Sequence, residues 1–107
     1  MDARIKQAGV ALVSSHLALM ECLILPLRQG QTGLVQDYDD FFAGQLTELV
    51  AYTEPIFRHA ADIRAAHNFR TPDALHLAAA LTAACDVFLT NDAQLKRFSQ
   101  ITVEVVQ

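Results

Sequence analysis

The sequence is poor in cysteine, glycine, proline and basic residues, and each shortage excludes a class of protein. Its two cysteines, Cys22 and Cys85, form no CxxC pair and accompany no clustered histidines, so they predict reduced, packed thiols rather than a disulfide scaffold or a zinc site. Four Gly and three Pro exclude collagen-like and low-complexity chains. Eight Lys and Arg against twelve Asp and Glu give a net charge of −4, which excludes nucleic-acid binding through bulk positive charge.

Long hydrophobic runs are also missing. The most apolar stretch, Val10 to Leu27, is interrupted by five residues that are costly in hydrocarbon or break its run, namely Ser14, Ser15, His16, Glu21 and Pro26. The N-terminal segment has an apolar run of only four residues, too short for the core of a secretory signal. We therefore expect a cytoplasmic protein without membrane contact.

What is present is a foldable core. The chain has 107 residues, of which 52% are hydrophobic and 19% charged, so it is too apolar and too lightly charged to be disordered. This length predicts a single domain over residues 1–107, large enough to build a core without disulfides or structural metal.

Helical and extended patterns alternate along the chain. Strands are predicted over 10–14, 46–52, 86–90 and 101–106, and helices over 2–8, 16–28, 34–43, 54–67, 72–84 and 91–98. Ser15, Thr53 and Thr71 each stand where a helix cap is expected. Alternation of this kind predicts an α/β fold of three layers, α/β/α, with a mainly parallel sheet covered on both faces. Functional sites in such folds lie beyond the carboxyl ends of the strands.

Three acidic residues occupy places that packing alone does not explain. Glu21 lies among apolar neighbours in LALMECLIL, so we expect it to be partly buried and therefore paired or bound to a metal. Asp73 stands in the first turn of a predicted helix, where it would either complement the helix dipole or serve a site. Asp92 follows the strand VFLT and is either a helix cap or a site residue.

If these three carboxylates converge, they would suit a hard divalent cation such as Mg²⁺ or Mn²⁺, which prefers oxygen ligands. Such a site supports phosphoryl transfer, because the metal activates water and neutralises charge on the phosphate. Thr90 and Asn91 lie next to Asp92 and would position that water or orient a carboxylate.

Residues 71–92, TPDALHLAAALTAACDVFLTND, resemble the C-terminal signature of PIN-domain nucleases of the VapC toxin type: an aspartate before Ala-Leu-His-Leu-Ala, an apolar helix, a short strand and Thr-Asn-Asp. Residues 10–30 resemble the second strand of that family and the helix that carries its glutamate. The resemblance implies a PIN-like metal-dependent ribonuclease. It also implies that Glu21, Asp73 and Asp92 are three of the family's four acidic site residues, and that a cognate antitoxin is encoded alongside.

The sequence departs from this family at its start. The family's first strand, which carries its first aspartate, has no counterpart here, because Asp2 precedes the helical pattern ARIKQ. We therefore expect that the central first strand is missing and that its apolar neighbours, 10–14 and 86–90, promote homo-oligomers. We also expect weak Mg²⁺ binding and little ribonuclease activity, or a catalytically dead remnant that acts only in protein interaction.

Several other features allow two interpretations. Arg70, Lys96 and Arg97 flank the site segments and would contact RNA phosphates or be ordinary surface charges. His76 would be a ligand or, more simply, a half-buried histidine with a hydrogen bond.

A helix-turn-helix DNA-binding unit is rejected, because no Lys or Arg occurs between Thr71 and Leu95. The apolar helices near 17–27 and 34–42 predict a groove for an antitoxin helix and a homodimer surface.

Overall fold

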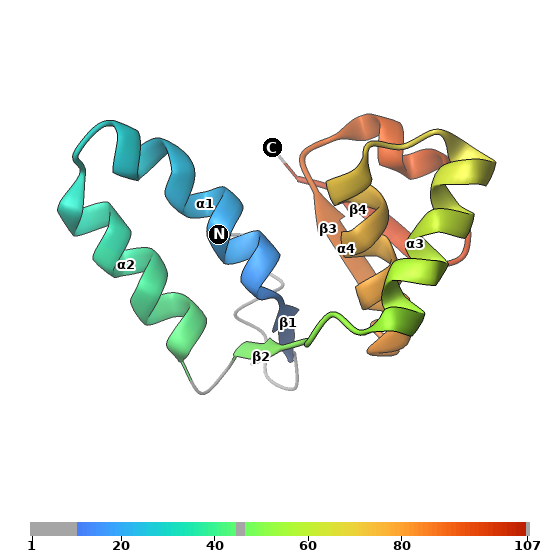
Figure 1. Cartoon of the computed structure of the whole chain (residues 1–107), viewed down its shortest axis with the longest axis horizontal. Coiled ribbons are helices and arrows are strands. Elements are labelled where there is room, and N and C mark those ends of the chain that lie inside the picture. The colour runs from blue at the N-terminus through green and yellow to red at the C-terminus, as the bar shows by residue number, and fades with distance from the viewer. Residues whose placement is uncertain (1–10, 45–46, 107) are drawn as a thin grey trace. The chain divides into compact units, whose positions relative to one another are not determined.

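The structure is a computed structural model that describes residues 11–44 and 47–106 (Figure 1). The chain divides into two compact units, residues 1–51 and 52–107. Short strands are separated by pairs of helices or by a short 3₁₀ helix, and the paired strands are parallel in both units, which confirms the predicted α/β class. The predicted helix over residues 2–8 lies outside the described residues.

The described residues of the first unit, 11–44 and 47–51, form two strands and two helices. Its elements are β1 (Leu12–Ser14), α1 (His16–Arg28), α2 (Thr32–Ala43) and β2 (Thr47–Leu49). The strands pair in parallel from Leu12 opposite Thr47 to Ser14 opposite Leu49, and α1 packs on α2. The second strand is shorter than the predicted 46–52 because its partner offers only three residues for pairing.

The limits of α1 follow from local chemistry. The hydroxyl oxygen of Ser15 accepts a hydrogen bond from the Ala18 amide at 3.2 Å, so the predicted cap is confirmed. Beyond Arg28 the chain turns through Gly30, whose φ of 66° is a conformation that glycine adopts without strain. The helix therefore has the bounds that the sequence predicts.

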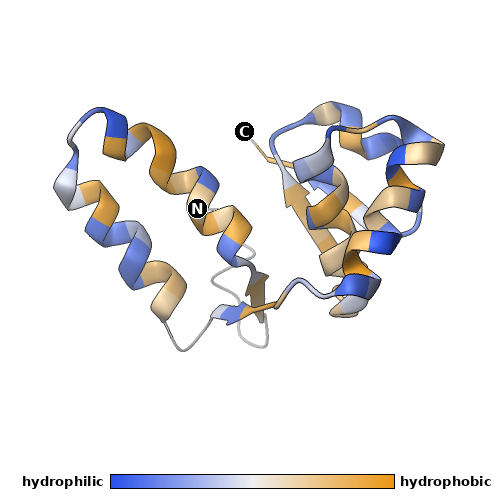
Figure 2. Ribbon diagram, in the orientation of Figure 1, coloured by the Kyte–Doolittle hydropathy of each residue, from blue (hydrophilic) through white to orange (hydrophobic). Residues whose placement is uncertain are grey.

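The ribbon of α1 is hydrophobic over most of its length (Figure 2), yet large apolar side chains of this helix are exposed. Within the described part of the chain, Pro26 is the one buried residue of this helix, and Leu27 is 62% exposed. Glu21 is exposed as well, so the expectation that it is partly buried is wrong. A helix buries only what its neighbours cover, and among the described elements of its unit α1 packs against one helix, α2.

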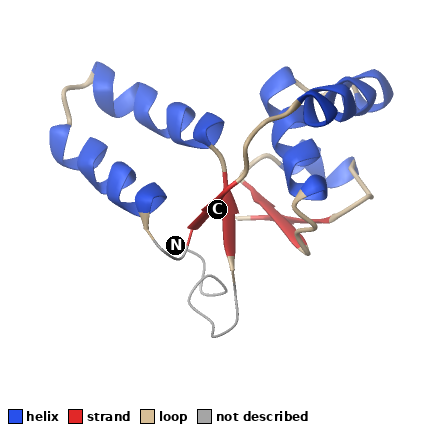
Figure 3. Cartoon of the chain, turned by 60° about the horizontal axis from the view of Figure 1, so that its bottom comes forward, coloured by secondary structure: helices blue, strands red, loops and turns tan. Residues whose placement is uncertain are grey.

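The second unit holds α3 (Glu54–His67), α4 (Thr71–Thr82), β3 (Val87–Thr90), the short 3₁₀ helix η2 (Ala93–Arg97) and β4 (Thr102–Val105). Its two strands pair in parallel from Val87 opposite Thr102 to Thr90 opposite Val105 (Figure 3). The core forms where α3 and α4 pack on each other, and its largest fully buried side chains are Phe98, Ile56, Leu77 and Leu95.

The starts of α3 and α4 differ from the prediction in one respect. Neither Thr53 nor Thr71 caps its helix through a side-chain hydrogen bond. In α3 the second helical residue is Pro55, which has no N–H, so one of the donors that a cap would satisfy is missing. In α4 the helix begins at Thr71 itself, and Asp73 is therefore its third residue.

No helix in the described ranges is long and apolar enough to cross a membrane.

Candidate functional site

Topology brings Asp73 and Asp92 to the same end of the second unit. The helix α4 runs from Thr71 to Thr82, and a turn over 83–86 then reverses the chain into β3. Because α4 and β3 run in opposite directions, the start of the helix and the end of the strand lie at one edge (Figure 1). This edge is the carboxyl end of a parallel strand pair, where sites of α/β proteins form.

The Asp73 carboxylate is held at the start of α4. Its side chain is 16% exposed, and its Oδ2 atom accepts a hydrogen bond from Arg70 Nε at 3.2 Å. The Arg70 side chain is 79% exposed, so the ion pair itself adds little stability. In the first turn, Asp73 also complements the helix dipole.

The Asp92 carboxylate is fixed by the backbone beyond β3. Its Oδ1 atom accepts from the Gln94 amide at 2.9 Å, and the Asp92 amide donates to Thr90 Oγ1 at 3.1 Å. Asp92 is thus the cap of η2, as one of its two interpretations predicts. The capping bond uses one carboxylate oxygen and leaves Oδ2 for another ligand.

Glu21 belongs to the first unit, so the three predicted ligands are divided between the two units. Burial raises the pKa of the neighbouring Cys22 thiol, and the Glu21 carboxylate raises this pKa further. Cys22 and Cys85 are half-buried and form no disulfide with each other. A thiol with a raised pKa is a poor nucleophile at neutral pH.

The donor chemistry of these acids fits magnesium or manganese. Across residues 11–44 and 47–106, no three His, Cys, Asp or Glu side chains group closely enough to hold a metal ion. Magnesium, however, keeps several waters and is commonly bound through one or two carboxylates together with substrate phosphates. Asp73 and Asp92, at one end of the second unit, supply that number of carboxylates.

His76 lies one helical turn after Asp73 and is half-buried. Its Nδ1 atom is 3.3 Å from the hydroxyl of Tyr52. This contact agrees with the simpler of its two interpretations, a partly buried histidine with a hydrogen bond. It ties the start of the second unit to α4.

The predicted RNA-contacting cations have different surroundings. Lys96 Nζ donates to the Val103 carbonyl at 3.2 Å, so its ammonium group is directed to β4. Arg97 Nη2 donates to the His67 carbonyl at 3.3 Å. Sequence reasoning missed Arg64, whose Nε donates to the Phe69 carbonyl at 2.7 Å; its place in the last turn of α3 was the available signal.

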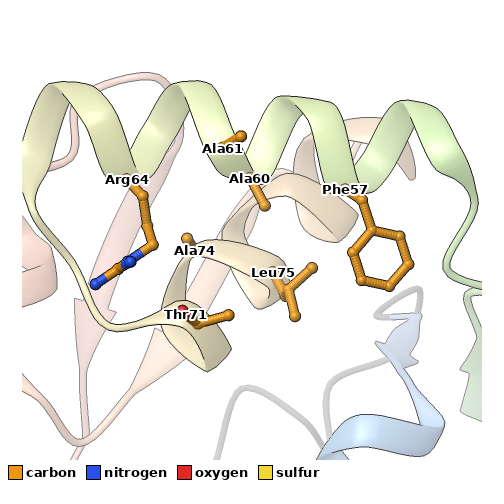
Figure 4. A pocket seen from close by; sticks show the side chains of 7 residues that line it. All are labelled: Phe57, Ala60, Ala61, Arg64, Thr71, Ala74 and Leu75. Atoms are coloured by element: carbon orange, nitrogen blue, oxygen red, sulfur yellow. The ribbon is translucent and has the colours of Figure 1, made fainter.

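An apolar groove lies between α3 and α4 and has a volume of about 210 Å³. Arg64 is at one end of this groove and Phe57 at the other (Figure 4). None of the acidic residues predicted for the site is among its lining residues. The groove reaches the start of α4 through Thr71 and Ala74, but the Asp73 side chain does not line it.

Comparison with known proteins gives one match. The family model described as PIN domain matches residues 1–101. No curated protein and no solved structure matches the chain significantly. The family match spans both units and all three predicted acidic site residues. The chain belongs to the PIN-domain family, whose members are typically nucleases that act on RNA or DNA and generally use divalent metal ions.

Proposed function

We propose that this protein is a metal-dependent endoribonuclease of the VapC toxin type, which cleaves phosphodiester bonds of single-stranded RNA in the cytoplasm. The observation that carries the proposal is the placement of Asp73 and Asp92 at one end of the second unit, where α4 starts and β3 ends. Two carboxylates at this edge are suited to a magnesium ion, which commonly takes one or two carboxylates and binds substrate phosphates at its other positions.

In this proposal Asp73, Asp92 and Glu21 hold Mg²⁺ or Mn²⁺. A bound ion of this kind supplies an activated water and neutralises charge on the phosphate. The protein's own task is to fix the carboxylates. Arg70 Nε donates to the Asp73 carboxylate, and the Gln94 amide donates to the Asp92 carboxylate, while the Thr90 hydroxyl accepts from the Asp92 amide. Asn91 is exposed beside Asp92 and can hydrogen-bond a water or a phosphate oxygen.

Cleavage of RNA is expected to depend on a divalent metal. A labelled single-stranded RNA should be cut in Mg²⁺ or Mn²⁺, at the low rate that the sequence predicts, and remain intact in EDTA, because the carboxylates alone repel a phosphate. The measurement is the initial rate of product formation, with single-stranded DNA of the same sequence as the matched control. Faster cleavage of the DNA would overturn the ribonuclease assignment, and no cleavage with either ion would overturn the proposed function.

We also propose that the first unit binds partners, a cognate antitoxin and a second copy of the chain. The support is the exposure of large apolar side chains on α1 and α2: Met20, Ile24, Leu25, Leu27, Leu34 and Phe41. Exposed apolar residues that cluster on one helix pair commonly mark an interaction surface. The same faces favour a second candidate function, a PIN-like interaction module that binds an antitoxin but cuts no RNA.

Replacing an exposed apolar residue of α1 should prevent self-association. The wild-type chain is expected to have about twice the 11.8 kDa mass of one copy, measured by light scattering during size-exclusion chromatography. Leu27→Glu should give the mass of one copy, because a buried unpaired charge is costly. Gln29→Glu, which places the same charge at an exposed position two residues on, is the control. A wild-type chain that is monomeric at every concentration would contradict this prediction.

A further inference from the structure

Two arginines bond to the short turn 67–70 between α3 and α4, and a third belongs to it. Arg64 donates from Nε to the Phe69 carbonyl at 2.7 Å. Arg97 donates from Nη2 to the His67 carbonyl at 3.3 Å, and its guanidinium carbon lies 4.8 Å from the centre of the Phe69 ring. Arg70 is part of the turn. Guanidinium groups from the end of α3 and from η2 are thus bonded to this turn, and the Arg70 side chain extends from the turn to Asp73. We call these three residues the arginine turn (Arg64, Arg70 and Arg97).

The segment that holds these groups is firmly packed. Asn68 takes the left-handed conformation, with φ 57°, and its amide donates to the Arg64 carbonyl at 2.8 Å. Phe69 is 4% exposed and stacks on the His67 ring, with 5.2 Å between ring centres. Both rings meet Phe98 edge-on. A cation on such a support loses less conformational freedom when it binds a ligand than one on a mobile loop.

The structural contacts leave most of the hydrogen-bonding capacity of these arginines unused. Each guanidinium has five N–H donors, and in the described part of the chain Arg64 and Arg70 each use one and Arg97 uses two. Two of the three are bound only to carbonyl oxygens, which carry no formal charge and so neutralise nothing. All three residues are exposed. The positive charge of Arg64 and Arg97 is therefore available to an anion from outside, and Arg70, which pairs with Asp73, keeps most of its donors for one.

We propose that the arginine turn is a phosphate-binding site for the backbone of single-stranded RNA, and that it holds nucleotides next to the bond to be cleaved. The RNA part of this statement rests on the proposed function. Guanidinium groups bind phosphate oxygens through paired, charge-assisted hydrogen bonds. RNA is favoured over an acidic peptide by position, because Arg70 is bonded to Asp73. An anion held there lies beside the proposed metal site, where the reacting group is a phosphate.

Salt dependence of RNA binding tests the site without requiring cleavage. Affinity of a fluorescent single-stranded RNA is measured by anisotropy in EDTA, over about 50–200 mM KCl. Each phosphate contact with a single strand contributes about −0.7 to the slope of log affinity against log salt concentration, so three contacts give a slope of about −2. Arg64→Gln, Arg70→Gln and Arg97→Gln should each reduce the slope by about 0.7 and weaken binding several-fold at low salt.

Arg58→Gln is the matched control, since Arg58 lies on α3 like Arg64 and is 80% exposed, but pairs with Glu54. It should leave the slope unchanged. Unfolding curves identify any variant that fails to fold. Arg70→Gln carries the test in that case, because this side chain bonds only to Asp73 among the described residues. Arg70→Lys should retain the slope, since the charge remains.

An unchanged slope in Arg70→Gln, or equal losses in Arg58→Gln, would overturn the site. Competition by polyglutamate as strong as by RNA at equal charge would overturn the choice of ligand.

The two proposals fail separately. RNA bound with the expected slopes but never cleaved in Mn²⁺ would overturn the nuclease function and leave the arginine turn in place. Normal cleavage with unaltered slopes would do the reverse.

Discussion

Asp73→Asn is expected to lower the rate of RNA cleavage by about 100-fold or more, while the fold changes little. Loss of a group that only orients a metal ligand commonly costs 10–100-fold, so the loss of a ligand's charge should reach or exceed the upper end of that range. Stability should fall by no more than about 1 kcal/mol, because the first-turn acid contributes a few tenths to 1 kcal/mol through the helix dipole. Its pair with the exposed Arg70 adds little.

Three measurements separate a lost ligand from a damaged fold: the initial cleavage rate in saturating Mn²⁺, the affinity for Mn²⁺ by calorimetry, and the free energy of unfolding in urea. Asp62→Asn is the matched control, since Asp62 is an exposed carboxylate of α3 in the same unit. It should keep wild-type rate and metal affinity. Cleavage retained in Asp73→Asn together with unchanged Mn²⁺ affinity would remove Asp73 from the site.

The elements that the sequence predicts well have their signals in adjacent residues. Ser15 starts α1 because its own side chain bonds the Ala18 amide three residues on. Asn68 ends α3 because it tolerates the left-handed conformation that the turn requires. Asp92 starts η2 by bonding the Gln94 amide. In each case the interacting residues lie within one helical turn of each other, so the local sequence is enough to predict where the helix starts or ends.

Burial is harder to predict, because it depends on what packs against an element. Glu21 has apolar neighbours on both sides in the sequence, yet it is exposed, and so are Leu25 and Leu27 on the same helix. The apolar residues of α1 correctly predict a helix with an apolar face. They do not show whether that face is buried by residues of the same unit or by another chain.

The acids of the second unit and the arginine turn show the same contrast. That Asp73 and Asp92 share an edge follows from element order alone, because a helix that returns into a parallel strand pair must start where the strand ends. The arginine turn has no such rule. Arg97 reaches the carbonyl of a residue thirty positions earlier, and backbone carbonyls are the same in every residue. The side chains of His67 and Phe69 therefore do not predict that arginines bind to their carbonyl oxygens.

Phe98→Ala is expected to lower the free energy of unfolding by about 3–5 kcal/mol, the usual cost of removing a buried phenylalanine. Phe98 is 2% exposed, and its ring meets those of His67 and Phe69 edge-on at 5.3 Å and 6.4 Å between centres. Its removal leaves a cavity under the turn that carries Arg70. For a domain with a total stability of about 5–15 kcal/mol, this is a large fraction.

Phe57→Ala is the matched control for this prediction, because it removes the same side chain from the same unit at a position that is 53% exposed. Its ring keeps only one described aromatic contact, with Tyr52, so we expect a loss of about 1 kcal/mol or less. Urea unfolding followed by circular dichroism measures both variants. Where Phe98→Ala remains folded, the cavity should also loosen the support of Arg97 and weaken RNA binding in EDTA, while Phe57→Ala binds as wild type. Equal destabilisation by the two changes would show that the ring of Phe98 does not support the turn.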